Sequence, residues 1–366
     1  MTYIHEDPDW PRFTWNVELL TGPLADIRHR QGRLIGRMES LGLPFRDQAN
    51  LTVLTDDIIK TSDIEGEVLD KDQVRSSIAR RLGLEVAGLV PSERAVDGIV
   101  EMMLDATQGY ARPLTIERLR GWHSALFPGG YSGLNRIRTG AWRDDSAGPM
   151  QVVSGALGRE RIHFEAPVAS RIPLEMSCFL SWFEERVDLD PLLKAGVAHL
   201  WFITIHPFED GNGRIARAIA DMALARADGI AERFYSMSSQ IRTERARYYE
   251  LLEATQRGGL DITQWLLWFL SCLGRAFEGA EKTLASVLMR AGVWERLKDK
   301  PLNDRQHRMI HRLLEGFEGH LTSSKWAKLM KCSQDTASRD IEDLVVRGVL
   351  RRSSSGGRST HYLLCV

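Results

Sequence analysis

The chain has 366 residues, of which 43% are hydrophobic and 27% are charged, and its formal net charge is −1. This composition excludes wholesale disorder, and the neutral balance gives the whole chain no charge-driven commitment to nucleic acid or to an anionic membrane. The four cysteines are widely separated and form no C-x-x-C pair, which argues against a disulfide framework or a zinc ribbon.

The first ten residues are acidic and lack the apolar stretch of a signal peptide. The longest strongly apolar run, 265–273, is too short to cross a bilayer, so we interpret it as a buried helix. We therefore expect a cytoplasmic protein without membrane contact.

Apolar residues recur at three- and four-residue steps through most of the chain, which predicts helices. The expected helices cover residues 22–41, 48–65, 70–82, 92–108, 115–126, 173–186, 192–204, 213–228, 243–257 and 262–290. Segments 150–153 and 161–164 alternate with period two around a glycine-containing connection, so a small hairpin is expected there. The fold class predicted for the bulk of the chain is all-α.

The tail differs from the rest of the chain. After Pro301 the pattern predicts helices at 303–316, 323–331 and 333–347 and then two short strands around a Ser/Gly-rich turn at 353–357, the outline of a winged helix-turn-helix. Residues 300–366 hold twelve Lys/Arg and seven Asp/Glu, a net of +5 that leaves −6 for the remainder. We expect three domains, at 1–92, 93–298 and 299–366.

The third helix of the tail is a candidate recognition helix for DNA. Its outward residues near the start would be Ser333, Gln334, Thr336, Ser338 and Arg339, and the wing would carry Arg351, Arg352 and Arg358. Such residues suit phosphate contacts and groove insertion, although many winged helices bind proteins or support dimers instead.

Residues 206–217 read H-P-F-E-D-G-N-G-R-I-A-R, between an apolar helix and the start of the next. The Gly-Asn-Gly run lets several backbone N–H groups converge at a helix N-terminus, which is a phosphate-binding geometry. Arg214 and Arg217 are three apart, so they share a helix face and can hold further phosphate oxygens.

The same loop supplies a carboxylate and an imidazole. Asp210 is placed to hold Mg²⁺, which favours one or two carboxylates plus substrate phosphates. His206, at the other end of the loop, suits a general base. Each residue alone is more often a cap, a turn or a core residue, but their conjunction predicts transfer of a phosphorus group from a nucleotide.

This stretch matches the signature H-x-F-x-[DE]-G-N-G-R-x-x-R without departure, so the chain resembles the Fic family across roughly 95–290. Further segments that carry the resemblance are 114–127, 140–143, 150–164 and 248–268. The resemblance implies a helical core with a hairpin flap and transfer of AMP from ATP, with Mg²⁺, to a Ser, Thr or Tyr hydroxyl. The acceptor would be a target protein or the chain itself, and a homodimer is expected because dimers are common among relatives.

Positions in the signature imply individual roles. His206 would deprotonate the hydroxyl, Asp210 would hold Mg²⁺, and Phe208 would anchor the loop in the core. The phosphate-binding set would be Gly211, Asn212, Gly213, Arg214 (α- and β-phosphates) and Arg217 (γ-phosphate). The presence of both Gly213 and Arg217 favours adenylylation over transfer of the γ-phosphate.

Weaker positions surround this set. Tyr248 or Tyr249, with Gln256, would contact adenine, although two core tyrosines on a helix explain the pattern equally well. On the flap, Val153 and Ser154 would lie at the nucleotide, and the free edge of the strand would pair with an extended target segment.

Residues 61–66 read T-S-D-I-E-G and resemble the family's inhibitory pattern [ST]-x-x-x-E-[GN] through Thr61, Glu65 and Gly66. Glu65 would pair with Arg217 and misplace the triphosphate, which matters because in-line positioning is most of the catalysis. The same carboxylate could instead orient water for removal of AMP, or be an exposed glutamate before a capping glycine.

The sequence thus predicts an autoinhibited protein adenylyltransferase whose tail targets it or binds DNA. The alternative is a DNA-binding regulator that uses the Fic core as a nucleotide sensor. The intact His206 and Asp210 favour the enzyme, because a sensor has no need of a base.

Overall fold

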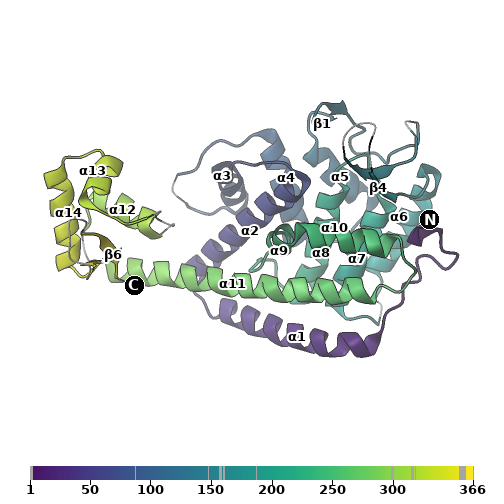
Figure 1. Cartoon of the computed structure of the whole chain (residues 1–366), viewed down its shortest axis with the longest axis horizontal. Helices are drawn as coiled ribbons and strands as arrows, with labels where there is room; N and C mark the ends of the chain where they lie inside the picture. The colour runs from purple at the N-terminus through teal and green to yellow at the C-terminus, as the bar shows by residue number, and fades with distance from the viewer. Residues whose placement is uncertain are drawn as a thin grey trace. The chain divides into compact units, whose positions relative to one another are not determined.

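A computed structural model describes residues 3–86, 88–146, 148–155, 159, 161–186, 188–297, 301–314, 317, 319–353 and 360–365 (Figure 1). Helices dominate and the strands form small antiparallel hairpins, which confirms the all-α prediction. The chain divides into two compact units, Met1–Lys282 and Thr283–Val366. The boundary predicted at 298/299 lies outside the described residues.

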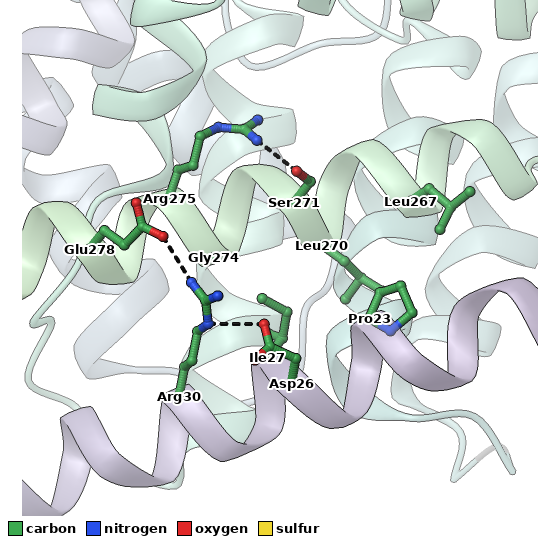
Figure 2. Close-up of a pocket in the computed structure, with 10 residues that line it drawn as sticks. All are labelled: Pro23, Asp26, Ile27, Arg30, Leu267, Leu270, Ser271, Gly274, Arg275 and Glu278. Carbon is green, nitrogen blue, oxygen red and sulfur yellow. Dashed lines mark hydrogen bonds and ion pairs between the residues drawn. The ribbon is translucent and has the colours of Figure 1, made fainter.

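The first long helix, α1 (Val17–Glu39), begins five residues earlier than its apolar stripe predicted, because Asn16 caps it by accepting from the Leu19 N–H at 3.1 Å. It lies along the part of α11 (Thr263–Leu297) that belongs to the first unit, as Figure 1 shows. Ion pairs such as Arg30–Glu278 (2.9 Å) join the two helices and border a surface pocket between them (Figure 2).

The next helix, α2 (Leu43–Glu65), carries at its C-terminal end the T-S-D-I-E-G pattern that we predicted to be inhibitory. It starts at Leu43 rather than at 48, since proline is tolerated in a first helical turn. Gly66 ends it in the left-handed conformation (φ 87°), as expected for a C-cap glycine. The helix packs against α3 (Lys71–Leu82), α8 (Asn212–Asp228) and α9 (Met237–Thr243).

The core of the first unit is built around α7 (Pro191–Ile205) and α8. Nearly every residue of α7 is buried, which agrees with a helix that is apolar all round. The surrounding helices are α4 (Arg94–Gln108), α5 (Ile116–Leu126), α6 (Ile172–Glu184), α10 (Arg245–Gln256) and α11. The helix predicted at 243–257 is α10, and α9, which precedes it and meets it at Glu244, was not predicted.

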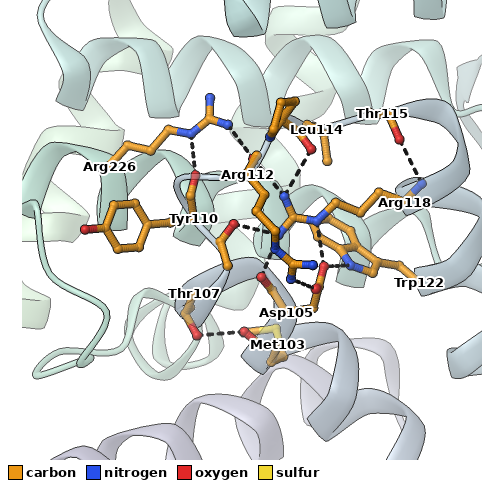
Figure 3. Close-up of polar contacts among 12 residues, drawn as sticks. Met103, Asp105, Thr107, Tyr110, Arg112, Leu114, Thr115, Arg118, Trp122 and Arg226 are labelled. Atoms are coloured by element: carbon orange, nitrogen blue, oxygen red, sulfur yellow. Dashed lines mark hydrogen bonds and ion pairs between the residues drawn. The ribbon is translucent and has the colours of Figure 1, made fainter.

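A polar network fixes α4 against α5 (Figure 3). Asp105 accepts hydrogen bonds from Arg112, from Arg118 Nε at 2.6 Å and from Trp122 Nε1 at 2.7 Å. These donors hold the pKa of the Asp105 carboxyl below its ordinary value although burial opposes the shift. The network positions the N-terminal part of the Fic-like segment.

A second buried network ties α2 to the core. Arg233 is 3% exposed and pairs with Asp221 of α8 at 2.8 Å, and its backbone N–H donates to Asn50 of α2 at 2.9 Å. Asp57, also on α2, accepts from the Ser238 N–H at 3.2 Å. Burial, reinforced by the nearby Asp57, raises the pKa of the Asp221 carboxyl well above its ordinary value. These contacts hold the middle of α2 firmly.

The described part of the first unit contains two β-hairpins. The predicted one pairs β3 (Gln151–Ser154) with β4 (Arg161–Glu165) and carries a bulge between Val152 and Val153. The other pairs β1 (Tyr131–Ser132) with β2 (Asn135–Arg136) and was not predicted, because strands this short show no alternation.

The second unit contains α12 (Asp304–Leu314), α13 (Ser323–Met330), α14 (Gln334–Val346) and a hairpin of β5 (Leu350–Arg352) with β6 (Tyr362–Leu364). Its core centres on Trp326, which is fully buried, with Met309 and Ile341. The element order is the one predicted for a winged helix-turn-helix. The turn at 354–357 and Arg358 lie outside the described residues. None of the helices described in the chain is long and apolar enough to cross a membrane.

Candidate active site

The loop between α7 and α8 is held in a fixed shape by its own residues. His206 ends α7 in the left-handed conformation (φ 51°), and Gly211 (φ 78°) precedes α8, which begins at Asn212, slightly earlier than predicted. The Asn212 side chain closes the loop on Phe208, accepting from its N–H at 3.0 Å and donating to its C=O at 2.8 Å. The phosphate contact predicted for Asn212 is therefore left to its backbone.

Phe208 is fully buried, in the anchoring position that we predicted. Its ring stacks on His123 with centroids 4.2 Å apart and contacts Trp142 at 4.9 Å. Burial lowers the pKa of His123 to about 4, so this imidazole is a neutral part of the core at pH 7. A Cβ at Gly211 would stand 2.9 Å from the Phe127 ring, so close packing adds to the positive φ in requiring glycine there.

The imidazole of His206 is partly buried and neutral. Burial lowers its pKa to about 4. Its Nδ1 lies 3.2 Å from the Ile203 carbonyl oxygen. In the neutral tautomer that donates this bond, Nε2 is the free acceptor, which is the form that a general base needs.

Arg143 is hydrogen-bonded to the backbone at His206, a role that we did not predict. The Arg143 Nε donates to the His206 carbonyl at 2.7 Å, and its backbone N–H donates to the Pro207 carbonyl at 2.9 Å. Its Nη2 donates to Pro167 O at 2.5 Å, and the side chain is 1% exposed. The sequence signal was the segment 140–143, which carries part of the family resemblance but gave no separate role to the arginine.

Asp210 lies beside the loop with its carboxylate oriented by two donors. Its Oδ1 accepts from the Gly211 N–H at 2.5 Å, and its Oδ2 accepts from the Ser132 hydroxyl of the β1–β2 hairpin. Within the described part of the chain no cluster of three metal-ligating side chains occurs. A lone carboxylate beside a phosphate cradle fits Mg²⁺, since this ion is commonly held by one or two carboxylates and the substrate phosphates.

Arg217 is bound by the end of α2. Its Nε donates to Thr61 Oγ1 at 2.6 Å, and its Nη2 donates to the Thr61 carbonyl at 3.0 Å and to Glu65 Oε1 at 2.7 Å. The guanidinium is 2% exposed, and its Nη1 has no hydrogen-bond partner among the described residues. The structure therefore places Glu65 against Arg217, as predicted, and adds contacts from Thr61 that we did not predict.

Gly213 makes this approach possible. A Cβ at Gly213 would stand 2.1 Å from Glu65 Oε1, closer than any real contact. The absence of a side chain at Gly213 thus leaves room for the Glu65 carboxylate, in addition to the phosphate-binding role that we predicted for this residue.

Arg214 is also paired with a carboxylate from the same segment. Its Nη1 donates to Glu67 Oε2 at 2.5 Å, and its guanidinium lies 5.0 Å from the centre of the Phe127 ring. Glu67 was absent from our predicted site, because it falls outside the six-residue inhibitory pattern.

The flap strands β3 and β4 are held to α10. Ser154 Oγ lies 2.5 Å from His163 Nε2, and His163 Nδ1 lies 2.6 Å from Glu253 of α10. Arg257 donates to the carbonyls of β4. Val153 is 48% exposed, and no backbone bond to the outer edge of β3 occurs within the described residues.

The three residues predicted near adenine differ in exposure. Tyr248 is 1% exposed and its hydroxyl lies 3.0 Å from His199 Nε2, which places it in the core. Gln256 is 3% exposed and donates to Thr204 at 3.2 Å. Tyr249 is only partly buried, with the Arg245 guanidinium 5.3 Å from its ring centre. The adenine prediction therefore rests mainly on Tyr249.

Comparison with known proteins gives two family matches. Residues 113–224 match the Fic/DOC family, and residues 3–84 match a domain of unknown function, DUF4172. Among curated relatives, the protein adenylyltransferase fic-1 of Caenorhabditis briggsae is 33% identical over 97 residues, 26% of this chain and 18% of that protein. The protein adenylyltransferase fic-1 of Caenorhabditis elegans is 27% identical over 130 residues, 34% of this chain and 24% of that protein. The chain thus matches less than a quarter of the length of these relatives.

Solved structures share the fold. A Fic family protein from Desulfovibrio desulfuricans G20 aligns with a TM-score of 0.55 at 21% identity, covering 97% of this chain and 98% of that one. A Fic domain containing signaling protein from Bacteroides thetaiotaomicron VPI-5482 aligns with a TM-score of 0.52 at 20% identity, covering 72% of this chain and 97% of that one. These likenesses show that the chain shares the fold of Fic proteins, and the segment that matches the Fic/DOC family, residues 113–224, includes the signature of residues 206–217 on the α7–α8 loop.

Proposed function

We propose that the protein transfers AMP from ATP to a Ser, Thr or Tyr hydroxyl of a target protein or of itself. The observation that carries the proposal is the α7–α8 loop, which places a neutral imidazole, a lone carboxylate and two buried arginines around one helix N-terminus. The curated relatives are named protein adenylyltransferases, which supports the same chemistry.

In this proposal His206 Nε2 takes the proton from the acceptor hydroxyl. The hydroxyl oxygen then bonds to the α-phosphorus, and the bond to the β-phosphate bridge breaks to release pyrophosphate. Arg214 holds the α- and β-phosphates and Arg217 the γ-phosphate, so the leaving group stays in line with the attack. Asp210 is the residue that would hold Mg²⁺, and the ion when bound neutralises phosphate charge.

The contacts of α2 support autoinhibition. Glu65 and Thr61 occupy the donors of Arg217 that the γ-phosphate would need, so a nucleotide must compete with them. A charge-assisted hydrogen bond is worth roughly 1.5–3 kcal/mol, about one to two powers of ten in population. We propose that the occupied state is the resting form, and removal of AMP through a water oriented by Glu65 is a second use of the same carboxylate.

The acceptor would approach along the flap. Val153 of β3 is exposed, and no described residue pairs with the outer edge of this strand, so an extended segment could add there as a further strand. Backbone pairing is largely independent of sequence, so the flap leaves the choice of target to contacts elsewhere.

The proposal is tested by incubating the wild-type, Glu65→Gly and His206→Ala proteins with Mg²⁺ and ATP labelled at the α-phosphate. We expect label on protein mainly in Glu65→Gly and none in His206→Ala, with ATP binding retained in the latter. Label on the His206→Ala protein would show that His206 is not the general base. Absence of label from every variant, despite ATP binding, would favour the nucleotide-sensor alternative.

We propose DNA as a second partner, bound by the C-terminal unit. Arg339 and Arg351 are exposed, whereas Arg352 pairs with Glu342 at 2.5 Å, which lowers the free positive charge. Binding of the full chain to duplex DNA should weaken steeply as salt rises, since phosphate contacts release counterions. Absence of binding at low salt would exclude this partner. Removal of residues 299–366 should leave self-labelling intact if the core is the enzyme.

A further inference from the structure

The residue that follows the inhibitory pattern is returned to the site by the turn at Gly66. With Gly66 left-handed, the Glu67 N–H donates back to the Ser62 carbonyl at 3.0 Å, which reverses the chain at the end of α2. This reversal lays the Glu67 carboxylate against Arg214, with Oε2 2.5 Å from Nη1. Val68, the next residue, is 90% exposed.

Arg214 has the features of an anion site that Glu67 fills only in part. Its side chain is 4% exposed, while that of Glu67 is 46% exposed. Within the described part of the chain the buried Nε of Arg214 has no hydrogen-bond partner, and neither has Nη1 of Arg217. A guanidinium has five N–H donors in a planar fork, which suits phosphate oxygens. The half-exposed Glu67 carboxylate therefore accepts from only some of the N–H donors of Arg214, and a phosphate group could accept from more of them.

We propose that Glu67 is a second carboxylate that competes with nucleotide, and that it acts at a different phosphate from Glu65. This inference rests on the proposed function, in which Arg214 binds the α- and β-phosphates and Arg217 the γ-phosphate. Glu65 then opposes binding of the γ-phosphate, which ADP lacks. Glu67 opposes ADP and ATP alike, because both carry the α- and β-phosphates.

A positioning role gives the opposite expectation. If Glu67 only holds Arg214 in the right rotamer, its removal loosens the guanidinium and weakens nucleotide binding. The Phe127 ring, whose centre is 5.0 Å from the guanidinium, gives Arg214 a packing partner other than Glu67. The structure therefore favours competition over positioning.

The test is calorimetric binding of Mg²⁺–ADP and Mg²⁺–ATP to the full chain as wild type, Glu67→Gln, Glu65→Gly and the double variant. Glu67→Gln should tighten ADP and ATP by the same factor, about three- to tenfold, since a half-exposed ion pair is partly screened. Glu65→Gly should tighten ATP more than ADP. The matched control is Asp63→Asn, which removes a carboxylate of the same turn that pairs only with Lys60 at 2.8 Å among the described residues, and should change neither affinity.

Equal or weaker binding of both nucleotides in Glu67→Gln would overturn the proposal. A gain confined to ATP would also overturn it, because Glu67 would then act at the γ-phosphate. Glu67→Ala, with no amide to replace the carboxylate, provides a second variant should Glu67→Gln be unstable. Failure of every variant to bind ADP or ATP would instead overturn the proposed function, so the two failures are distinguishable.

Discussion

The guanidinium of Arg143 is hydrogen-bonded through Nε to the carbonyl oxygen of His206, at 2.7 Å. The bond fixes the backbone of a residue that stands in a left-handed conformation, which L-residues with a Cβ rarely adopt. Arg143 also bonds the carbonyls of Pro207 and Pro167, so it sets where the imidazole lies relative to the loop.

Replacing Arg143 should therefore affect the chemical step more than nucleotide binding. In a Glu65→Gly background, we expect Arg143→Ala to lower kcat for self-labelling by about tenfold to a hundredfold, as displacement of a base by an ångström can cost. The Kd for ATP should change little, and Arg143→Lys should recover part of the rate. Arg138→Ala, which removes an exposed arginine paired with Asp144 at 2.7 Å, is the control. Equal losses in kcat and ATP affinity would mean general damage.

Thr61 contributes to the hold on Arg217 separately from Glu65. Thr61→Val keeps the shape of the side chain but loses the hydroxyl that accepts from Arg217 Nε at 2.6 Å. We expect labelling to rise by a factor of about three to ten, less than in Glu65→Gly, because the carboxylate remains. Thr55→Val, which removes a buried hydroxyl bonded only within α2 among the described contacts, should leave labelling at the wild-type level. A Thr61→Val protein as inactive as wild type would confine the hold to Glu65.

Gly213 and Glu65 should be coupled in stability. Because a Cβ at position 213 would meet Glu65 Oε1 at 2.1 Å, Gly213→Ala must displace the carboxylate from Arg217. We expect a loss of about 1–2 kcal/mol in the free energy of unfolding in the wild-type background and a much smaller loss in Glu65→Gly, measured by urea denaturation. Equal losses in both backgrounds would place the strain in the loop itself.

The activity should be insensitive to pH in the range where an ordinary histidine titrates. His206 must be neutral to act as base, and burial lowers its pKa to about 4, so it is charged only below that pH. For Glu65→Gly we expect kcat/KM to change by less than about twofold between about pH 5.5 and 7.5. An unperturbed histidine would lose most of its neutral base form as the pH falls across that interval. An acid limb centred near pH 6.5 would show that the imidazole is solvated in the working enzyme.

Arg233 should be essential to the stability of the first unit. It faces Asp221 at 2.8 Å and Asp228 at 3.2 Å, and all three side chains are almost completely buried. Arg233→Ala leaves two buried carboxylates without their cation, so we expect a loss of about 3–5 kcal/mol in the free energy of unfolding. Arg12→Ala removes an exposed arginine that pairs with Asp9 and should cost less than about 1 kcal/mol.

The sequence predicted those parts of the molecule that depend on local pattern. Helices with a clear apolar stripe were found within a few residues, and the signature identified His206 and Asp210 because the loop that joins them is contiguous. The pairing of Glu65 with Arg217 crosses 152 positions, and only the family resemblance made it visible.

The missed residues share a physical reason. Arg143, Ser132 and Glu67 reach the site through turns whose direction depends on backbone conformation, and none has a periodicity. Tyr248 and Gln256 were ambiguous because a helix presents several faces, and the sequence does not say which one is buried. Tertiary contacts decide both which loop residues reach the site and which face of a helix is buried.

The buried contacts of Asn50 and Asp57 restrict how the proposed resting state can end. Since α2 is anchored along its middle, detaching the whole helix would break the hydrogen bonds from the Arg233 N–H to Asn50 and from the Ser238 N–H to Asp57, and buried groups left without such bonds cost about 1–3 kcal/mol each. Unwinding only its last turn would free Thr61, Glu65 and Glu67 together, while the anchored portion stays in place. An activating protein would need to hold only that short segment, and a weak binder of a few residues could thereby switch on the enzyme.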